Sequence, residues 1–249
     1  MVVEQPIGRW TALILAAVLA FILAPAARAA TITVTTTNDV VGMDGKISLR
    51  EAIVSISNGA DVNPDVTHTG TYGVGDTVVV PSAAAHYAVT GGELASTKSL
   101  AITGGGAATT VIDAGGASRV LHLTSTAGVA SVSGVTITGG HAPAPGGGAI
   151  FAEAAPLTIS GSSFTGNDAT AAGGTTRGGG ALWLGAGGTI DSSSFTNNAF
   201  TETAGVSNVG GGAIFGSNLT LTITNSSFVQ NSASLASGSN NGGGAVYQD

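Results

Sequence analysis

The stretch Gly-Gly-Gly-Ala-Ile-Phe at residues 146–151 decides the fold, because it returns three more times at a fixed interval. The copies are GGGALW at 178–183, GGGAIF at 210–215 and GGGAVY at 242–247, so the three intervals between successive blocks are identical. Self-similarity at a fixed period of this size indicates a solenoid in which each repeat packs against its neighbours. Such a chain is a scaffold first, and any catalytic chemistry needs separate support.

A second block inside the repeats predicts the strands. Ile159, Ile190 and Ile223 each precede a phenylalanine at the same spacing, and an asparagine follows each phenylalanine, again at one spacing. The phenylalanines are Phe164, Phe195 and Phe228, and the asparagines are Asn167, Asn198 and Asn231. Segments this short and this rich in Ile, Val, Thr and Phe favour strands over helices.

Strands too short to pair within a repeat are expected to pair with the same strand of the next repeat. This arrangement is an all-β parallel β-helix, and we predict three parallel ladders with coils about 4.8 Å apart. The isoleucines and phenylalanines would stack inward, and the asparagines would form amide ladders at a turn. The repeated glycines fit sharp bends with positive φ.

The aromatic residue that closes each glycine block permits two interpretations. These residues are Phe151, Trp183, Phe215 and Tyr247. Alternation along a strand places Ile150 and Phe151 on opposite faces, so an inward Ile150 would leave an exposed aromatic ladder able to stack sugars or meet a partner. Alternatively, the aromatic side chains pack beneath the long loops, since exposed apolar stripes are rare in proteins without a partner.

Composition argues against nucleic acid as a partner and against disulfide bonds as a source of stability. Charged residues make up 8% of the chain, against about 25% in ordinary globular proteins, and 40 of the 249 residues are glycine. No basic patch is present, so nucleic acid is not an expected partner. The chain has no cysteine, so an exported form would depend on packing and backbone hydrogen bonds for its stability.

The segment 1–29 has the features of a secretory signal peptide. Arg9 provides the positive part, residues 11–23 the apolar part, and Ala27-Arg28-Ala29 a small-residue cleavage site. After the signal peptide (1–29) we expect a strand and capping helix (30–60), the first coils (61–145) and the repeats (146–249). Removal of the signal peptide changes the net charge from −7 to −8. An extracellular or outer-membrane location is therefore expected.

Residues 49–57 are predicted to form a helix that caps the solenoid. Ser48 and Glu51 have the spacing of a capping box, and Asn58-Gly59 would end the helix. Leu49, Ala52, Ile53 and Ile56 recur on one face. That face would cover the apolar end of the first coil, and residues 31–37 read as a strand beside it. Arg50 is either a functional cation or the partner of a nearby carboxylate.

The segment Ser48-Leu49-Arg50-Glu51-Ala52 resembles the CSLREA domain found at the start of secreted bacterial right-handed β-helix proteins. Ile47 stands where that domain has its cysteine. The Gly-Gly-Ala-Ile and Phe-x-x-Asn blocks resemble the repeats of polymorphic outer membrane proteins. The resemblance implies a right-handed β-helix that is secreted or displayed on the cell surface, often adhesive and often followed by an autotransporter barrel. Because residue 249 falls within a coil, any such membrane part would lie beyond it.

Candidate catalytic and metal-binding residues are sparse. A lyase needs acidic calcium ligands beside an arginine or lysine base, and a hydrolase needs paired carboxylates. The best acid and cation pair is Asp113 with Arg119, and we expect no enzyme activity and no cofactor. Asp61-x-Asn63-x-Asp65 resembles the opening of a calcium loop but lacks the glycine and glutamate that complete one. The four histidines show no metal-ligand spacing.

Three functions remain open on these residues. The first is a secreted or surface β-helix that acts as an adhesin or interaction scaffold, with a host or cell-surface protein or glycan as its partner. The second is a polysaccharide-active enzyme of the pectate lyase or glycoside hydrolase type, which would require carboxylates clustered on adjacent coils. The third is a carbohydrate-binding module, which would require outward-facing Phe151, Trp183 and Phe215.

Overall fold

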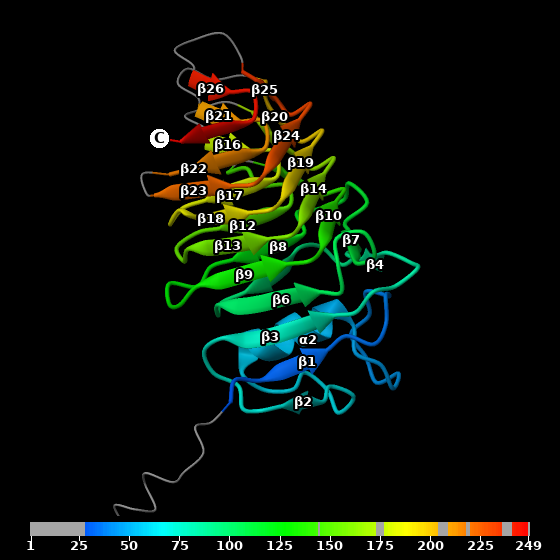
Figure 1. The fold of residues 1–249 in the computed structure, drawn as a ribbon. Coiled ribbons are helices and arrows are strands. Elements are labelled where there is room, and N and C mark those ends of the chain that lie inside the picture. The colour runs from blue at the N-terminus through cyan, green and yellow to red at the C-terminus, as the bar shows by residue number, and fades with distance from the viewer. Residues whose placement is uncertain are drawn as a thin grey trace, which may run out of the picture.

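A computed structural model describes residues 28–143, 145–172, 177–203, 209–217, 220–235 and 241–248. The fold is a β-solenoid in which short strands stack from coil to coil, as Figure 1 shows. Within the described part, α2 (Leu49–Asn58) is the one helix and the β1–β2 pair is the one antiparallel pairing. The predicted parallel β-helix with a short N-terminal capping helix is therefore confirmed.

Five sheets form the walls of the solenoid, and we number them in the order in which the chain visits them. Sheet I runs in the order β2 (His68–Thr69), β1 (Thr31–Thr33), β3 (Asp76–Val80), β6 (Leu100–Gly104), β9 (Ala130–Ser133), β13 (Leu157–Ser160), β18 (Gly188–Asp191) and β23 (Leu221–Thr224). Sheet II contains β4 (Tyr87–Ala88), β7 (Val111–Asp113), β10 (Thr136–Thr138), β14 (Ser163–Thr165), β19 (Ser194–Thr196) and β24 (Ser227–Val229).

The other three sheets complete the coils, with sheet V present from the early coils and sheets III and IV only in the later ones. Sheet III contains β11 (His141–Pro143), β15 (Asp168–Ala171), β20 (Ala199–Glu202) and β25 (Ser232–Ser234), and sheet IV contains β16 (Arg177–Gly179), β21 (Val209–Gly211) and β26 (Asn241–Gly243). Sheet V contains β5 (Leu94–Ser96), β8 (Leu121–Leu123), β12 (Ile150–Ala152), β17 (Leu182–Leu184), β22 (Ile214–Gly216) and β27 (Val246–Gln248).

The number of ladders differs from the prediction of three. The repeats carry five, because the segment that follows each asparagine forms sheet III and the first glycines of the repeated blocks form sheet IV. Strand pairing between coils uses backbone N–H and C=O groups, so even segments of alanine and glycine pair once the coils lie in register. Hydrophobic periodicity does not report such strands.

The interior contains the stacked residues that the sequence predicted. Phe164 lies on Phe195 with ring centroids 4.9 Å apart and an interplanar angle of 5°, and Phe228 follows at 4.9 Å and 7°. Ile159 and Ile190 are fully buried, and Ile223 is half-buried in the last described coil. One hydrophobic core extends without interruption from Ile32 to Ile214. The three predicted segments that follow the signal peptide therefore share a single core.

A ladder of asparagine amides runs beside the phenylalanines, as predicted. The Nδ2 of Asn167 donates to Oδ1 of Asn198 (3.0 Å), and Nδ2 of Asn198 donates to Oδ1 of Asn231 (2.9 Å). Each Oδ1 also accepts a hydrogen bond from a backbone N–H one coil earlier. The same Nδ2 atoms reach the carbonyls of Ile137, Phe164 and Phe195. These amides satisfy the backbone groups that the turn removes from the sheets.

The glycine blocks exist for close packing rather than for chain reversal. Among the glycines of these blocks, only Gly147 has a positive φ (91°), so the prediction of positive φ is wrong for the others. A Cβ on Gly178 or Gly210 would overlap the ring of Phe200, which is fully buried. A Cβ on Gly179 would overlap the carbonyl oxygen of Leu182. Phe200 packs with Ala169 and Ala171 of sheet III and with Leu235 in a second, smaller core that is separate from the main one.

The capping helix begins and ends where the sequence predicted. The Oγ of Ser48 accepts a hydrogen bond from the backbone N–H of Glu51 (3.1 Å), and Glu51 Oε2 accepts one from the N–H of Ser48 (2.8 Å). Gly59 ends the helix in the left-handed conformation, with φ 72°. Ile53 and Ile56 are fully buried in the main core. The strand is shorter than the predicted 31–37, because the backbone beyond β1 pairs with Ile47 instead.

Removing one rung of the amide ladder is expected to destabilise the solenoid. Asn198→Ala deletes four hydrogen bonds and leaves the Phe164 carbonyl and the Asn167 N–H buried without these partners. We expect a loss of about 3 kcal/mol in the free energy of unfolding. Asn231→Ala, in a half-buried rung that water reaches, should cost about 1 kcal/mol. Urea denaturation followed by circular dichroism measures both, and equal losses would contradict the ladder's role.

The capping helix provides a second test. Ser48→Ala should cost about 1 kcal/mol through the lost cap. Ile53→Asp should cost about 4 kcal/mol, because it buries an unpaired charge against the first coils. Val54→Asp places the same charge one residue away at a half-buried position and serves as the control, with a loss below about 1 kcal/mol. Thermal melting measures all three. An Ile53→Asp protein as stable as the Val54→Asp protein would remove the capping role.

Candidate functional site

An aromatic row runs along the outer face of sheet V. Ile150, Leu182 and Ile214 point into the bore and are fully buried. The next residue of each sheet V strand lies on the opposite face, and these residues pair across the coils in the order His122, Phe151, Trp183, Phe215 and Tyr247. Successive ring centroids lie 4.9, 4.6, 5.9 and 6.0 Å apart. His122 therefore extends the predicted row by one coil.

The row does not present a platform of ring faces. Phe151 is 7% exposed and Phe215 is fully buried, while Trp183 and Tyr247 are half-buried. Trp183, Phe215 and Tyr247 stack face to face along the coil axis, with interplanar angles of 22° and 14°. Each ring face is covered by the next ring, because the coils lie one strand spacing apart. The exposed-ladder interpretation is therefore wrong for Phe151 and Phe215.

A charged cluster lies at the end of this row and joins three successive coils. Nδ1 of His122 lies 3.0 Å from Oε1 of Glu93, and Nε2 lies 3.0 Å from Oε1 of Glu153. Arg119 Nη1 is 2.6 Å from Oε2 of Glu93, and the Arg119 guanidinium lies 4.9 Å from the centroid of the Phe151 ring. We refer to Glu93, Arg119, His122 and Glu153 as the His122 cluster.

The geometry of the His122 cluster limits the chemistry it can perform. Glu93 and Glu153 lie two coils apart, which corresponds to about 9.6 Å between their strands. The His122 imidazole fills the space between the two carboxylates and contacts both. A glycosidase needs its scissile bond in that space. The arrangement in this structure is therefore a closed set of contacts, with one ion pair between Arg119 and Glu93 and two hydrogen bonds of His122. The Glu93 and Glu153 side chains are 35% and 43% exposed at its rim.

The sequence carries a signal for this cluster that the repeat pattern does not reveal. Glu93, His122 and Glu153 follow one another at intervals close to one coil, but the glycine blocks that mark the repeats begin only at Gly146. The pair that we singled out instead, Asp113 with Arg119, is wrong as a pair. Asp113 accepts a hydrogen bond from the N–H of Gly115 (2.8 Å) and contacts His86 (3.1 Å), whereas Arg119 binds Glu93.

Arg50 has a structural partner. Its guanidinium makes two 2.8 Å hydrogen bonds to the Asp39 carboxylate and two more to the carbonyls of Gly92 and Glu93. The Asp39 side chain is 1% exposed. Burial by itself raises the pKa of this carboxyl. The hydrogen bonds from Arg50 and from the N–H groups of Gly91 and Thr90 outweigh burial and hold the pKa below its usual range. Arg50 thus fastens the capping helix to the first coils.

The three residues that resembled a calcium loop do not converge on one point. Asp61 accepts from Tyr72 Oη (2.5 Å), Asn63 donates to Glu51 Oε1 (2.6 Å), and Asp65 accepts from the N–H of Gly45 (2.6 Å). Across the described residues, no group of three or more His, Asp or Glu side chains has the geometry to hold a metal ion. The turn at 61–65 therefore uses its side chains in local hydrogen bonds.

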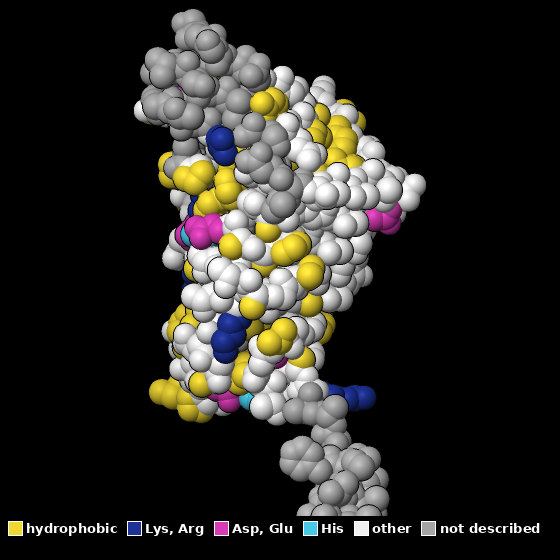
Figure 2. All heavy atoms as spheres, turned by 90° about the vertical axis from the view of Figure 1, so that its left-hand side faces the viewer, with side chains coloured by type: hydrophobic (Ala, Val, Ile, Leu, Met, Phe, Trp, Pro, Cys, Tyr) yellow, Lys and Arg dark blue, Asp and Glu magenta, His cyan; other side chains and the backbone are white. Residues whose placement is uncertain are grey.

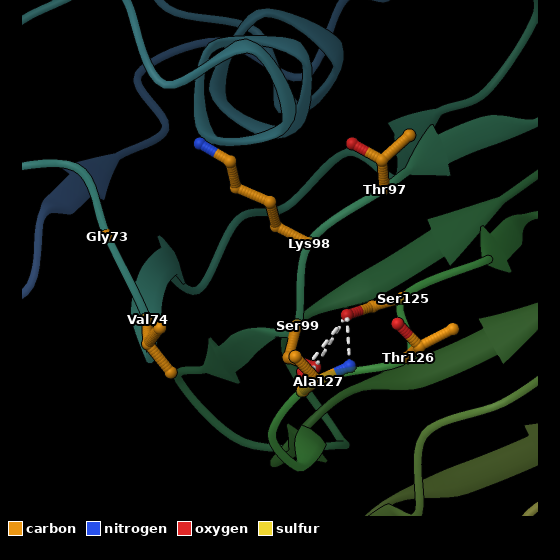
Figure 3. A pocket seen from close by; sticks show the side chains of 8 residues that line it. All are labelled: Gly73, Val74, Thr97, Lys98, Ser99, Ser125, Thr126 and Ala127. Atoms are coloured by element: carbon orange, nitrogen blue, oxygen red, sulfur yellow. Dashed lines mark hydrogen bonds between the residues drawn. The ribbon is translucent and has the colours of Figure 1, made fainter.

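Two shallow depressions lie near the N-terminal end. One, of about 280 Å³, is lined mainly by threonines of the β1 and β2 region. The other, of about 210 Å³, includes Val74, Lys98, Ser99 and Ser125. Figure 3 shows Lys98 extending toward the capping helix and away from the serines. Ser99 and Ser125 both donate to the carbonyl of Ala127, so their hydroxyl groups are already used. Neither depression gathers a catalytic set.

The surface around these features is mostly uncharged. On the face that Figure 2 shows, Lys, Arg, Asp and Glu side chains are few and lie among hydrophobic and uncharged ones. Within the described ranges, no helix is long and apolar enough to cross a membrane. The predicted signal peptide lies outside the described residues apart from Arg28 and Ala29.

Comparison with family models, with curated proteins and with solved structures found no match to this chain. The resemblance to CSLREA-domain and polymorphic outer membrane proteins therefore stays a prediction that rests on the residues quoted above.

The low pKa of Asp39 predicts a pH dependence of stability. Because the folded-state pKa lies below that of the unfolded chain, the contribution is present above pH of about 4 and is lost as pH falls through the folded pKa. Asp39→Asn should lower the free energy of unfolding at pH 7, and the stability of this variant should fall less than that of the wild type as the pH is lowered. Asp44→Asn, at an exposed position of the same loop, should lose stability with falling pH as the wild type does. Thermal melts from pH 7 to pH 2 test this, and parallel curves for wild type and Asp39→Asn would contradict it.

Proposed function

We propose that this chain is an exported β-helix scaffold, displayed extracellularly or at the outer membrane, that acts as an adhesin or interaction protein of the polymorphic outer membrane type. The supporting observation is the closed His122 cluster. The imidazole fills the gap between Glu93 and Glu153, and Arg119 neutralises the first of these carboxylates. The inward side chains pack against one another in the core, so the outer walls are the surfaces that could contact a host or cell-surface protein or glycan.

The packing of Ala30 supports export. Its backbone nitrogen lies 2.8 Å from Oδ1 of Asp76, a fully buried residue whose carboxylate otherwise accepts from the N–H of Gly73. Cleavage after Ala29 would turn this nitrogen into an ammonium group and give the buried carboxylate an opposite charge. Burying a charge is costly unless it is paired. The cut would also remove the pairing of Ala29 with Thr71.

A polysaccharide-active enzyme is the second candidate. The observation in its favour is that carboxylates, a histidine and an arginine gather on adjacent coils, which is the condition stated above for this function. It would require His122 to swing out of the gap before a glycan could enter. A carbohydrate-binding role has weaker support, because neighbouring rings cover the aromatic faces of the row.

One experiment separates the candidates. The full chain is exported from a bacterial host, where the mature product should begin at Ala30 by mass spectrometry. The purified protein, fixed to beads, should retain intact cells of the kind to which it adheres. Cells whose surface proteins or glycans have been removed by protease or glycosidase should bind at least several-fold less. The same protein should leave pectin, polygalacturonate and neutral glucans uncut, with or without calcium.

Controls decide how each outcome is read. New reducing ends or unsaturated products that disappear in Glu153→Gln but persist in Asp168→Asn would establish the enzyme and overturn the proposal. Asp168 pairs with His141 (2.6 Å) on sheet III, so its variant alters a comparable pair on another wall. Retention of stripped and intact cells in equal amounts would remove the adhesive function.

A further inference from the structure

The outer face of sheet I is a regular two-column array of hydroxyl groups. The strand registers place Thr31, Thr77, Ala101, Ser131, Thr158, Thr189 and Thr222 in one column and Thr33, Val79, Thr103, Ser133, Ser160, Asp191 and Thr224 in the other. Eleven of these fourteen positions are serine or threonine, and all are half-buried or exposed. Figure 1 shows these strands stacked in nearly the same direction along one wall of the solenoid.

Most of these hydroxyl groups have no partner in the described part of the chain. Ser133 donates weakly to a carbonyl (3.5 Å) and Thr224 donates to Asp191 (2.6 Å), but the other nine make no side-chain hydrogen bond there. The neighbouring wall, sheet II, differs. Its Thr138 donates to the Thr165 carbonyl (2.7 Å), and Ser194 donates to Ser163 (3.0 Å). Sheet II satisfies several of its hydroxyls internally, whereas sheet I leaves most of its own available.

The composition of this wall argues against most macromolecular partners. Apart from Asp191 it has no charge, so it offers nothing to nucleic acid, anionic lipid or acidic glycan. Protein-binding surfaces concentrate Tyr, Trp and Arg, and the array has none. It has no aromatic face for a sugar either. What remains is a rigid, neutral lattice of hydroxyl and methyl groups.

We propose that this wall binds the surface of ice. Hydrogen-bonded oxygens lie about 2.8 Å apart, so second neighbours in a tetrahedral water network lie about 4.5 Å apart. Strands of a sheet repeat at about 4.8 Å, close to that spacing, along the seven strands of the array. Threonine is restricted at χ1, and the parallel backbone fixes each Cβ, so little order is lost on binding. The assignment is independent of the adhesive function proposed above.

The test measures partition of the full exported chain into slowly grown ice and its thermal hysteresis. The wild-type protein should enter ice at least several-fold above the level of Thr158→Lys/Thr189→Lys. That variant places two long charged side chains at the paired fifth and sixth positions of the first column. Thr165→Lys/Thr196→Lys is the matched control, because the same two coils carry these paired threonines on sheet II. The control should partition like wild type, and circular dichroism checks that all three proteins are folded.

Each other result overturns the proposal. Wild-type protein excluded from ice as fully as the Thr158→Lys/Thr189→Lys variant would mean that the wall does not bind ice. If both double variants entered ice as well as the wild-type protein does, the ice-binding surface would lie elsewhere on the molecule. Retention on crystalline cellulose that only the sheet I variant loses, without ice partition, would assign the array to a polysaccharide instead. Cell retention by the beads does not depend on these outcomes, so the two proposals fail separately.

Discussion

Parallel backbone pairing between equivalent strands of successive coils is the constraint on which this structure depends. It holds the coils one strand spacing apart, about 4.8 Å, and so places each side chain on its counterpart in the next coil. Each position that recurs in every coil therefore favours a residue type whose side chain can stack on an identical side chain of the next coil. Phenylalanine rings stack within 7° of parallel, and asparagine amides each donate to the next. The glycine blocks follow from the same constraint, since neighbouring backbones leave no room for a Cβ.

The same constraint explains the low charge of the chain. A charged residue repeated at an equivalent position would face its own sign at the strand spacing, which is destabilising. Two sets of charged side chains on the sheet walls are accordingly paired with unlike groups from neighbouring coils. Glu93, His122 and Glu153 alternate acid, imidazole and acid, and His141 faces Asp168. A charge fraction of 8% is the expected result for a chain made mostly of stacked walls.

Both functions proposed above use the outer walls of the solenoid. The bore is filled by side chains, and the two depressions are shallow and lack a catalytic set. Sheet V carries an aromatic row that ends at the His122 cluster, whereas most hydroxyl groups on sheet I have no partner among the described residues. Rigid stacking pre-organises each wall, so a partner that matches its repeat binds without ordering flexible loops. This property suits both adhesion and attachment to a periodic surface.

The sequence alone determined the features that depend on local or strictly periodic signals. The capping box at Ser48 and Glu51, the helix end at Gly59, and the inward stacking of isoleucine, phenylalanine and asparagine all follow from short spacings. Tertiary structure alone decided the additional ladders of sheets III and IV, because their pairing uses backbone atoms that every residue shares. It also decided which charges meet. Along sheet I, Ser131 pairs with Thr158, Thr158 with Thr189 and Thr189 with Thr222, and no two of these three sequence intervals are equal. Since coil length varies in this way, only the folded register places Glu93, Arg119, His122 and Glu153 together and separates Arg119 from Asp113.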